Sequence, residues 1–195
     1  MATMLNQITS PKTTAGALAV LAVLALGVVQ AQEPDIVIAD FEAATYGKWI
    51  VTGTAFGAGP VNGALPDQMP VEGFRGGGLV NSYHGGDNST GTLTSPPFKV
   101  KRKFIQFLIG GGGWEGKTCI NLLRDGKVVR TATGPNTQSG GSEQLLPQRW
   151  DVSEFMNQSV ALQIVDQAGG TWGHINVDQI IQTDWKLIGA AAPRR

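Results

Sequence analysis

The sequence predicts an all-β domain, an antiparallel β-sandwich of jelly-roll-like type with about eight strands. Short runs rich in Val, Ile and Thr alternate with Gly, Pro, Asn and Asp along residues 36–184, which is typical of sandwich strands joined by tight turns. No stretch of this region shows the 3.6-residue spacing of apolar side chains that marks an amphipathic helix. A chain of 195 residues is long enough for one such domain with its own core.

Turn residues divide this region into candidate strands. The clearest pair is a hairpin around Asp125-Gly126, because Asp-Gly between apolar runs favours the type I′ turn that matches the twist of a sheet. Residues 150–156 are expected to form one short helical turn, and residues 185–195 a loosely ordered tail. The expected strands span residues 35–40, 49–53, 78–83, 91–94, 103–109, 118–124, 127–133, 160–165 and 174–181.

Residues 1–31 have the pattern of a secretory signal peptide. Lys12 precedes an apolar run at residues 15–29, and Val29-Gln30-Ala31 offers a small-residue cleavage site before Gln32. This run is shorter than the ~20 residues that a membrane span needs, although a retained anchor is the alternative. We expect the processed chain to be secreted, periplasmic or attached to the cell surface, and not to be an integral membrane protein.

The charged residues and the single cysteine exclude several classes of function. Fifteen basic and fifteen acidic residues cancel, and no basic stripe is present, which argues against nucleic acid as a partner. The short basic run at residues 99–103 fits a solvated strand edge. Cys119 has no second cysteine to pair with, so we expect a small buried residue in a strand.

Residues 111–118, GGGWEGKT, match the phosphate-binding pattern G-x-x-x-x-G-K-[ST]. That motif holds phosphate at the N-terminus of a helix that begins at the Lys-Thr pair. Here the Asp125-Gly126 turn follows too soon for a helix, and the crossover helices of a parallel sheet are not visible. We therefore expect no nucleotide binding. The glycines indicate a loop whose backbone lies close to another surface, with Trp114 at its exposed tip.

Several longer strings carry a resemblance to a known family. They are DFE (40–42), GFRG (73–76), LVNSYHGGD (79–87), TGTLTSP (90–96), FLIGGG (107–112), TCINLL (118–123) and GTWGHINVDQI (170–180). Together they resemble the non-catalytic β-sandwich module beside the catalytic domain of bacterial, planctomycete-type levanases and inulinases. The resemblance implies an exported module that binds carbohydrate, with fructans as the expected polysaccharide. The catalytic motifs of those hydrolases, WMNDPNG, RDP and EC, do not occur in this sequence, so we expect no catalysis.

Sugar-binding sites pair an aromatic ring, which covers the apolar face of a sugar, with polar side chains that bind its hydroxyls. Loops on a rigid scaffold are the usual place for such residues. Structural roles compete with this interpretation, because sandwich tryptophans often pack in the core and His174 is expected to make a structural hydrogen bond. The candidate carbohydrate-binding residues are Trp114, Trp172, His84, Asp87, Asn88 and Arg75.

A structural calcium ion is the one cofactor that the sequence suggests. Calcium prefers hard oxygen ligands, and Asp40, Glu42 and Asp178 stand near the ends of the first and last expected strands. Exposed carboxylates at strand ends are the alternative interpretation of these residues.

Three functions stay open from the sequence: a carbohydrate-binding module, a fragment or divergent relative of a fructan hydrolase, and a structural or protein-interaction domain of the cell envelope. Two carboxylates flanking one cleft would favour the hydrolase. Exposed aromatic rings beside polar groups would favour the sugar-binding module, and a flat apolar patch would favour a protein partner.

Overall fold

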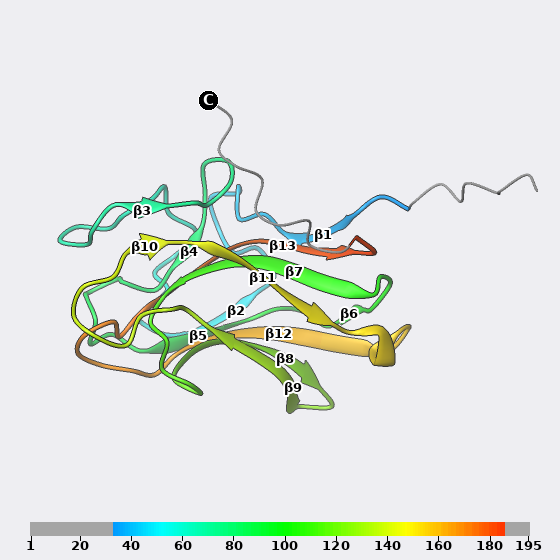
Figure 1. The fold of residues 1–195 in the computed structure, drawn as a ribbon. Coiled ribbons are helices and arrows are strands. Elements are labelled where there is room, and N and C mark those ends of the chain that lie inside the picture. Colours follow the sequence, from blue (N-terminus) through cyan, green and yellow to red (C-terminus); the bar gives the residue numbers. More distant parts are fainter. Residues whose placement is uncertain (1–32, 186–195) are drawn as a thin grey trace, which may run out of the picture. The chain divides into compact units, whose positions relative to one another are not determined.

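The computed structural model describes residues 33–185, which form two antiparallel sheets packed face to face (Figure 1). The predicted all-β sandwich is therefore confirmed. The predicted signal peptide, residues 1–31, and all of the predicted tail except Trp185 lie outside the described residues. Within the described part of the chain, no helix is long and apolar enough to cross a membrane.

The first sheet has the order β1-β13-β7-β11, with β4 also paired to β13. The second has the order β2-β5-β12-β8-β9, with β6 also paired to β12. The first-sheet strands are β1 (Ile36–Ala39), β4 (Val80–Asn81), β7 (Phe104–Gly111), β11 (Leu146–Asp151) and β13 (Ile175–Thr183). The second-sheet strands are β2 (Ile50–Gly53), β5 (Gly91–Thr94), β6 (Phe98–Lys99), β8 (Thr118–Arg124), β9 (Lys127–Thr133) and β12 (Ser159–Asp166). A separate parallel pair joins β3 (Val71–Glu72) to β10 (Glu143–Gln144).

The core lies between the two sheets and follows the two-residue period of a strand. In β7 the side chains of Ile105, Phe107 and Ile109 are buried, while those at positions 104, 106 and 108 are partly exposed. In β12 the buried Leu162 and Ile164 face them from the second sheet and belong to the same cluster. Because alternate side chains point to opposite faces of a sheet, each strand contributes one apolar face to the core.

Every expected strand is present, and the hairpin at Asp125-Gly126 joins β8 to β9. Both turn residues have positive φ, 51° at Asp125 and 74° at Gly126, as a type I′ turn requires. Cys119 is buried in β8 as expected. This strand begins at Thr118, where a phosphate-binding loop would begin a helix.

Four strands, β3, β6, β10 and β11, were not expected from the sequence. Three of them have two residues each, too short for an alternating pattern. The fourth, β11, contains Pro147 and pairs with β7 alone. A proline is tolerated there because an edge strand leaves one row of backbone groups unpaired. The expected helical turn at residues 150–156 shrinks to the 3-10 turn Ser153–Phe155.

The glycine-rich segment lies under the backbone of the loop that leads into β13. The Gly112 N–H donates to the carbonyl of His174 at 2.7 Å. A Cβ at Gly112 would overlap the Trp172 carbonyl oxygen and lie 2.8 Å from Thr118 Oγ1. Glycine is therefore required for this close approach, which confirms the interpretation of the glycines. This close contact with Gly112 fixes the position of the Trp172–His174 segment.

Replacing Gly112 with alanine tests this close approach. The added methyl group would push the 112–113 backbone away from the Trp172 carbonyl, and we expect a loss of about 1–3 kcal/mol of unfolding free energy. Gly77→Ala is the matched control, because its Cβ would have only an ordinary contact, 3.5 Å from Glu42 Oε2, and its cost should stay below about 0.5 kcal/mol. Urea unfolding of both variants gives the comparison. Equal midpoints would show that the loop adapts freely.

Candidate functional site

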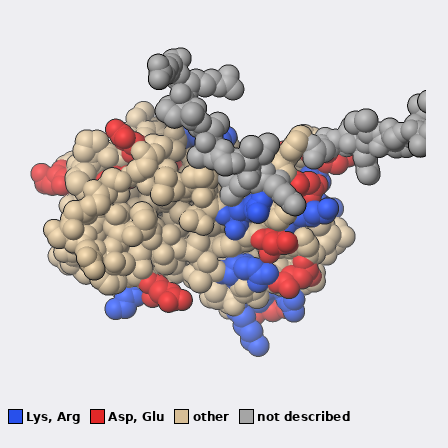
Figure 2. Space-filling model, viewed as in Figure 1, with Lys and Arg blue, Asp and Glu red and all other residues tan. Residues whose placement is uncertain are grey.

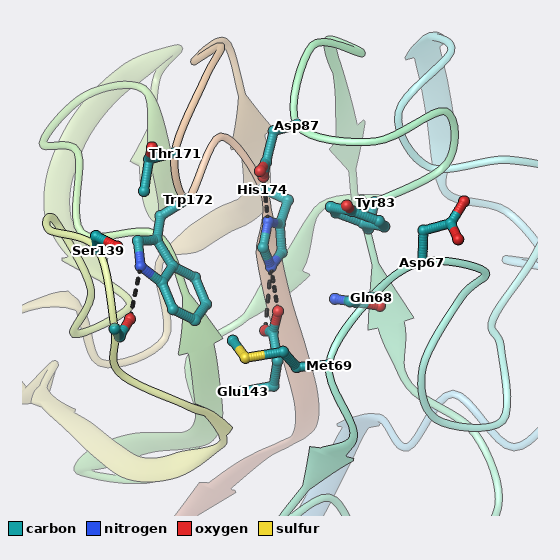
Figure 3. Close-up of a pocket in the computed structure, with 11 residues that line it drawn as sticks. Asp67, Gln68, Met69, Tyr83, Asp87, Ser139, Glu143, Thr171, Trp172 and His174 are labelled. Atoms are coloured by element: carbon teal, nitrogen blue, oxygen red, sulfur yellow. Dashed lines mark hydrogen bonds and ion pairs between the residues drawn. The ribbon is translucent and has the colours of Figure 1, made fainter.

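A pocket of about 230 Å³ opens where the loops at one end of the sandwich meet (Figure 3). Four chain segments form it: the loop between β2 and β3, the loop that follows β4, the segment that leads into β10, and the loop between β12 and β13. Its lining residues are Asp67, Gln68, Met69, Tyr83, Asp87, Ser139, Gly140, Glu143, Thr171, Trp172 and His174.

His174 lies at the centre of this pocket and is held by a carboxylate at each ring nitrogen. Nδ1 is 2.6 Å from Asp87 Oδ1, and Nε2 is 2.9 and 3.0 Å from the two oxygens of Glu143. The side chains of His174 and Glu143 are 3% and 2% exposed. Glu143 also accepts a hydrogen bond from the amide of Asn176 at 2.8 Å. The structural hydrogen bond predicted for His174 is therefore present.

Two opposing effects set the charge of His174. Burial alone would lower its pKa, whereas the hydrogen bonds and charges of Glu143 and Asp87 raise the pKa, and the net result is a pKa above the ordinary value. A doubly protonated imidazolium can donate to both carboxylates at once. His174 is therefore best described as a buried cation that orders its neighbours, with neither nitrogen free to act as a base.

Two aromatic rings flank this cation. The ring of Tyr83 meets His174 edge-on, with centroids 4.9 Å apart, and the indole of Trp172 lies 5.6 Å away at an interplanar angle of 32°. Figure 3 shows the imidazole between these two rings. Burial, with help from the nearby carboxylates, raises the pKa of the Tyr83 hydroxyl above its ordinary value. The phenol therefore remains a hydrogen-bond donor at neutral pH.

Two residues of the pocket occupy backbone conformations that favour glycine. Trp172 has φ 60° and Asp67 has φ 65°. Each is the third residue of a tight turn, one closed by Gly173 N–H to the Gly170 carbonyl at 2.8 Å and the other by Gln68 N–H to the Leu65 carbonyl at 3.1 Å. A positive φ at that position is the mark of a type II turn, where glycine or asparagine is usual. Both turns thus carry strain to present a larger side chain.

A second buried carboxyl group, Asp166, lies near this site at the end of β12. It is fully buried, and neither carboxylate oxygen has a hydrogen-bond partner of good geometry among residues 33–185. Burial raises its pKa to about 7, and the neighbouring Ser82 hydroxyl, Ala168 amide and His174 charge offset this only in part. Asp166 therefore changes its charge near neutral pH.

The six predicted carbohydrate-binding residues do not gather in one place. Trp172 and Asp87 line the pocket, and His84 lines a neighbouring depression. Asn88 accepts a hydrogen bond from the Gly170 N–H at 3.1 Å, and Trp114 donates its indole N–H to the Thr171 carbonyl at 3.1 Å. Both support the β12–β13 loop rather than line either cavity.

Two predicted features differ in detail from the structure. Trp172 is only 5% exposed, because its indole N–H donates to the carbonyls of Gln138 and Gly140; it forms a wall of the pocket rather than a free platform. Trp114 is half-buried rather than fully exposed. Arg75 is exposed and lines neither cavity, and it is its backbone N–H that binds Asp178, at 2.7 Å.

The predicted calcium ligands hold a loop through backbone amides. Glu42 accepts hydrogen bonds from the N–H groups of Gly77 and Gly78, and Asp178 accepts from those of Arg75 and Gln179. Within residues 33–185 no three His, Cys, Asp or Glu side chains gather in a metal-binding arrangement. A calcium ion at Asp40, Glu42 and Asp178 would need carbonyl or water ligands as well, and it stays a prediction.

Several pocket residues were not identified from the sequence, namely Asp67, Gln68, Met69, Tyr83, Ser139, Glu143 and Thr171. Glu143 is the most important of these. It begins a strand of two residues, and its partner His174 is 31 residues away. Asp67 follows a proline in a turn, and the string Pro66-Asp67 was the one available signal that a turn positions a carboxylate there.

No family model matches the chain. The protein ecdE of Aspergillus rugulosus, whose name assigns it to the glycosyl hydrolases, is 45% identical over 132 residues. The match covers 68% of this chain and 18% of that protein. The chain therefore spans less than a fifth of the length of this relative.

Solved structures with a similar arrangement of strands include a cyclase from Fischerella sp. TAU, with a TM-score of 0.48 and 14% identity, covering 77% of this chain and 97% of that one. The K1 cleaved adhesin domain of Lys-gingipain from Porphyromonas gingivalis W83 has a TM-score of 0.48 and 13% identity, covering 79% and 100%. TmCBM61 in complex with β-1,4-galactotriose has a TM-score of 0.46 and 15% identity, covering 74% and 94%. Likeness at this level does not extend to function.

The buried Asp166 predicts how stability depends on pH. Its pKa is raised from 3.8 to about 7 on folding, so its contribution to stability is fully present below about pH 4 and is lost as the pH rises through about 7. Asp166→Asn removes this loss, and we expect the variant to be more stable than the parent at pH 8, by up to roughly 4 kcal/mol, with little difference at pH 4.

Urea unfolding at both pH values measures this, with Asp125→Asn as the control. Asp125 is 84% exposed, and asparagine tolerates its positive φ. A variant that is less stable than the parent at pH 8 would show that the Asp166 carboxylate is ionised and paired in the folded protein.

Proposed function

We propose that this domain binds a neutral carbohydrate in the pocket that Trp172 and Tyr83 help to line and that it does so without catalysis. The observation that carries the proposal is the strain at Asp67 and Trp172, the two non-glycine residues with positive φ that line one pocket. Such conformations cost about 1–3 kcal/mol each and cluster at functional sites. The two turns are therefore less stable than unstrained turns would be, and they place a carboxylate and an indole in the lining of the same pocket.

The chemistry of the pocket suits a sugar. Trp172 and Tyr83 offer apolar ring surface, and Asp67, Asp87 and Ser139 offer acceptors for hydroxyl groups. Ligand pockets in general combine apolar walls with a few placed polar groups. A polyol with hydroxyl donors on its edge and C–H groups on its face meets both kinds of surface at once.

The charges of the pocket favour a neutral ligand. Its lining holds Asp67, Asp87 and Glu143 against the one imidazolium of His174, and none of its described residues is Lys or Arg. Figure 2 shows most of the Lys and Arg side chains of this face gathered on the right, away from the left end where β3, β4 and β10 lie in Figure 1. An acidic glycan would bring like charges together, which costs affinity.

The arrangement of the carboxylates argues against glycoside hydrolysis. Hydrolases place two carboxyl groups on either side of the scissile bond. Here the imidazole of His174 fills the space between Asp87 and Glu143, so a substrate bond cannot lie there. Both carboxylates also bind the ring nitrogens of His174, which occupies oxygens that a catalytic acid would need. The hydrolase alternative rests on the name of the A. rugulosus relative and on the resemblance to levanase and inulinase modules.

Those two likenesses also suggest where the domain works. We propose an exported accessory module that keeps an enzyme or a cell surface close to a polysaccharide, with fructans first among the candidates. A cell-envelope protein partner is the alternative, and it would leave this pocket without a ligand.

Binding can be tested by titration calorimetry and affinity gels with levan, inulin and β-1,4-galactan. We expect Trp172→Phe to weaken binding of the responding glycan about tenfold, because the smaller ring loses contact surface worth about 1–1.5 kcal/mol and also loses the hydrogen bonds to Gln138 and Gly140 that fix this wall. Trp185→Phe is the matched control, since Trp185 is 46% exposed and lies outside the pocket, and its affinity should equal that of the parent.

Two results would overturn the proposal. The first is the absence of binding to any of the three neutral glycans by a folded protein. The second is release of reducing sugar above the level of a heat-inactivated control, which would place the domain among the hydrolases.

A further inference from the structure

We propose that the binding site is a groove of two adjoining subsites, so that the domain binds a chain of at least two neutral sugar residues rather than a single sugar. This inference rests on the proposed function. The second subsite is a depression of about 390 Å³ next to the pocket, lined by Leu65, Pro66, Asp67, Tyr83, His84, Gly85 and Gly86. Asp67 and Tyr83 line both cavities.

The shared residues place the two cavities side by side. Tyr83 has its ring against His174 in the first subsite, at 4.9 Å, and the following residue, His84, lines the second. Residues 83–86 form a tight turn, in which the Gly86 N–H donates to the Tyr83 carbonyl at 2.9 Å and Gly85 has φ 83°. This turn brings Tyr83 to the first subsite and His84 to the second. Successive side chains of one turn therefore serve neighbouring subsites.

Asp67 forms the opposite side of the junction. The Leu65–Gln68 turn gives it a positive φ and is braced by Gln68, whose side-chain oxygen accepts from the Leu65 N–H at 3.0 Å and from the Asn81 amide at 2.7 Å. Because Asn81 belongs to β4 and is fully buried, the turn is fixed to the sheet. The strained turn thus places the Asp67 carboxylate where two consecutive sugar residues would meet.

The size of the cavities favours a chain over a single sugar. The first subsite, at about 230 Å³, is smaller than the roughly 300–1,000 Å³ typical of ligand pockets. A monosaccharide in it would leave the second subsite unfilled. A linear oligosaccharide would continue past Tyr83 and Asp67 and bury surface in both cavities.

The second subsite also has the chemistry of a neutral-sugar site. Its described lining has no Lys or Arg, and burial lowers the pKa of His84, so the imidazole is uncharged at neutral pH. The His84 ring packs over Gly57, where a Cβ would overlap the ring. Its Nε2 is buried against Gly57 without a hydrogen-bond partner among residues 33–185, so His84 contributes an uncharged ring wall to the second subsite.

The experiment is a nuclear magnetic resonance titration of the protein with fructotriose and galactotriose, and with fructose and galactose as their single-sugar controls. The Trp172 indole N–H reports on the first subsite, and the amides of Gly85 and Gly86 report on the second. We expect a responding trisaccharide to move both sets of signals and to bind at least tenfold more tightly than its monosaccharide. The monosaccharide should move the Trp172 signal at higher concentration. Trigalacturonate should move neither set.

His84→Ala gives an independent measurement. It removes a wall of the second subsite, and we expect the ratio of trisaccharide to monosaccharide affinity to fall toward one, with the fold verified by the unchanged dispersion of the core methyl signals. A trisaccharide that moves only the Trp172 signal, with no gain over the monosaccharide, would overturn the two-subsite groove and leave the proposed function intact. If no neutral sugar moves either set, the proposed function itself is wrong.

Discussion

The buried imidazolium of His174 is the interaction on which the functional end of the molecule depends. A buried charge is expensive unless it is paired and hydrogen-bonded, and this one has a carboxylate at each nitrogen. Glu143 arrives from β10, and Asp87 from the loop after β4. Each of these two hydrogen-bonded pairs attaches one chain segment to His174, the residue immediately before β13. Loss of either carboxylate would leave one buried ring N–H of His174 without an acceptor and release a wall of the pocket.

A second constraint is the closeness of backbone to backbone under this site. Gly112 allows the Trp172–His174 segment to lie directly against it, with Gly112 N–H bound to the His174 carbonyl. The two packed sheets support the loops that form the pocket, and two turns in these loops hold Asp67 and Trp172 in strained conformations. These contacts hold the walls of the pocket in place, which reduces the conformational entropy lost on binding.

Individual residues show how far prediction from sequence reaches. Asp125-Gly126 specified its hairpin because the turn chemistry is local. Trp172 and Asp87, predicted to bind carbohydrate, line the pocket, since glycine-rich loops at strand ends gather at the ends of a sandwich. Glu143 escaped notice because its strand has two residues and its partner is distant in sequence. Arg75 is predicted as a sugar ligand from its polar side chain between glycines, yet the contact that the structure shows is a backbone hydrogen bond to Asp178, which no side-chain pattern can reveal.

By itself the sequence determined the all-β class, most strand positions, the central hairpin and the strand, rather than a helix, that begins at the end of GGGWEGKT. These follow from interactions between near neighbours, such as side-chain alternation, turn preferences and the length available before the next turn. Only the tertiary structure decided which polar residues meet. The pairing of His174 with Asp87 and Glu143 joins residues 87 and 31 positions apart. The packing of the two sheets and their loops places such residues together, and no local pattern encodes it.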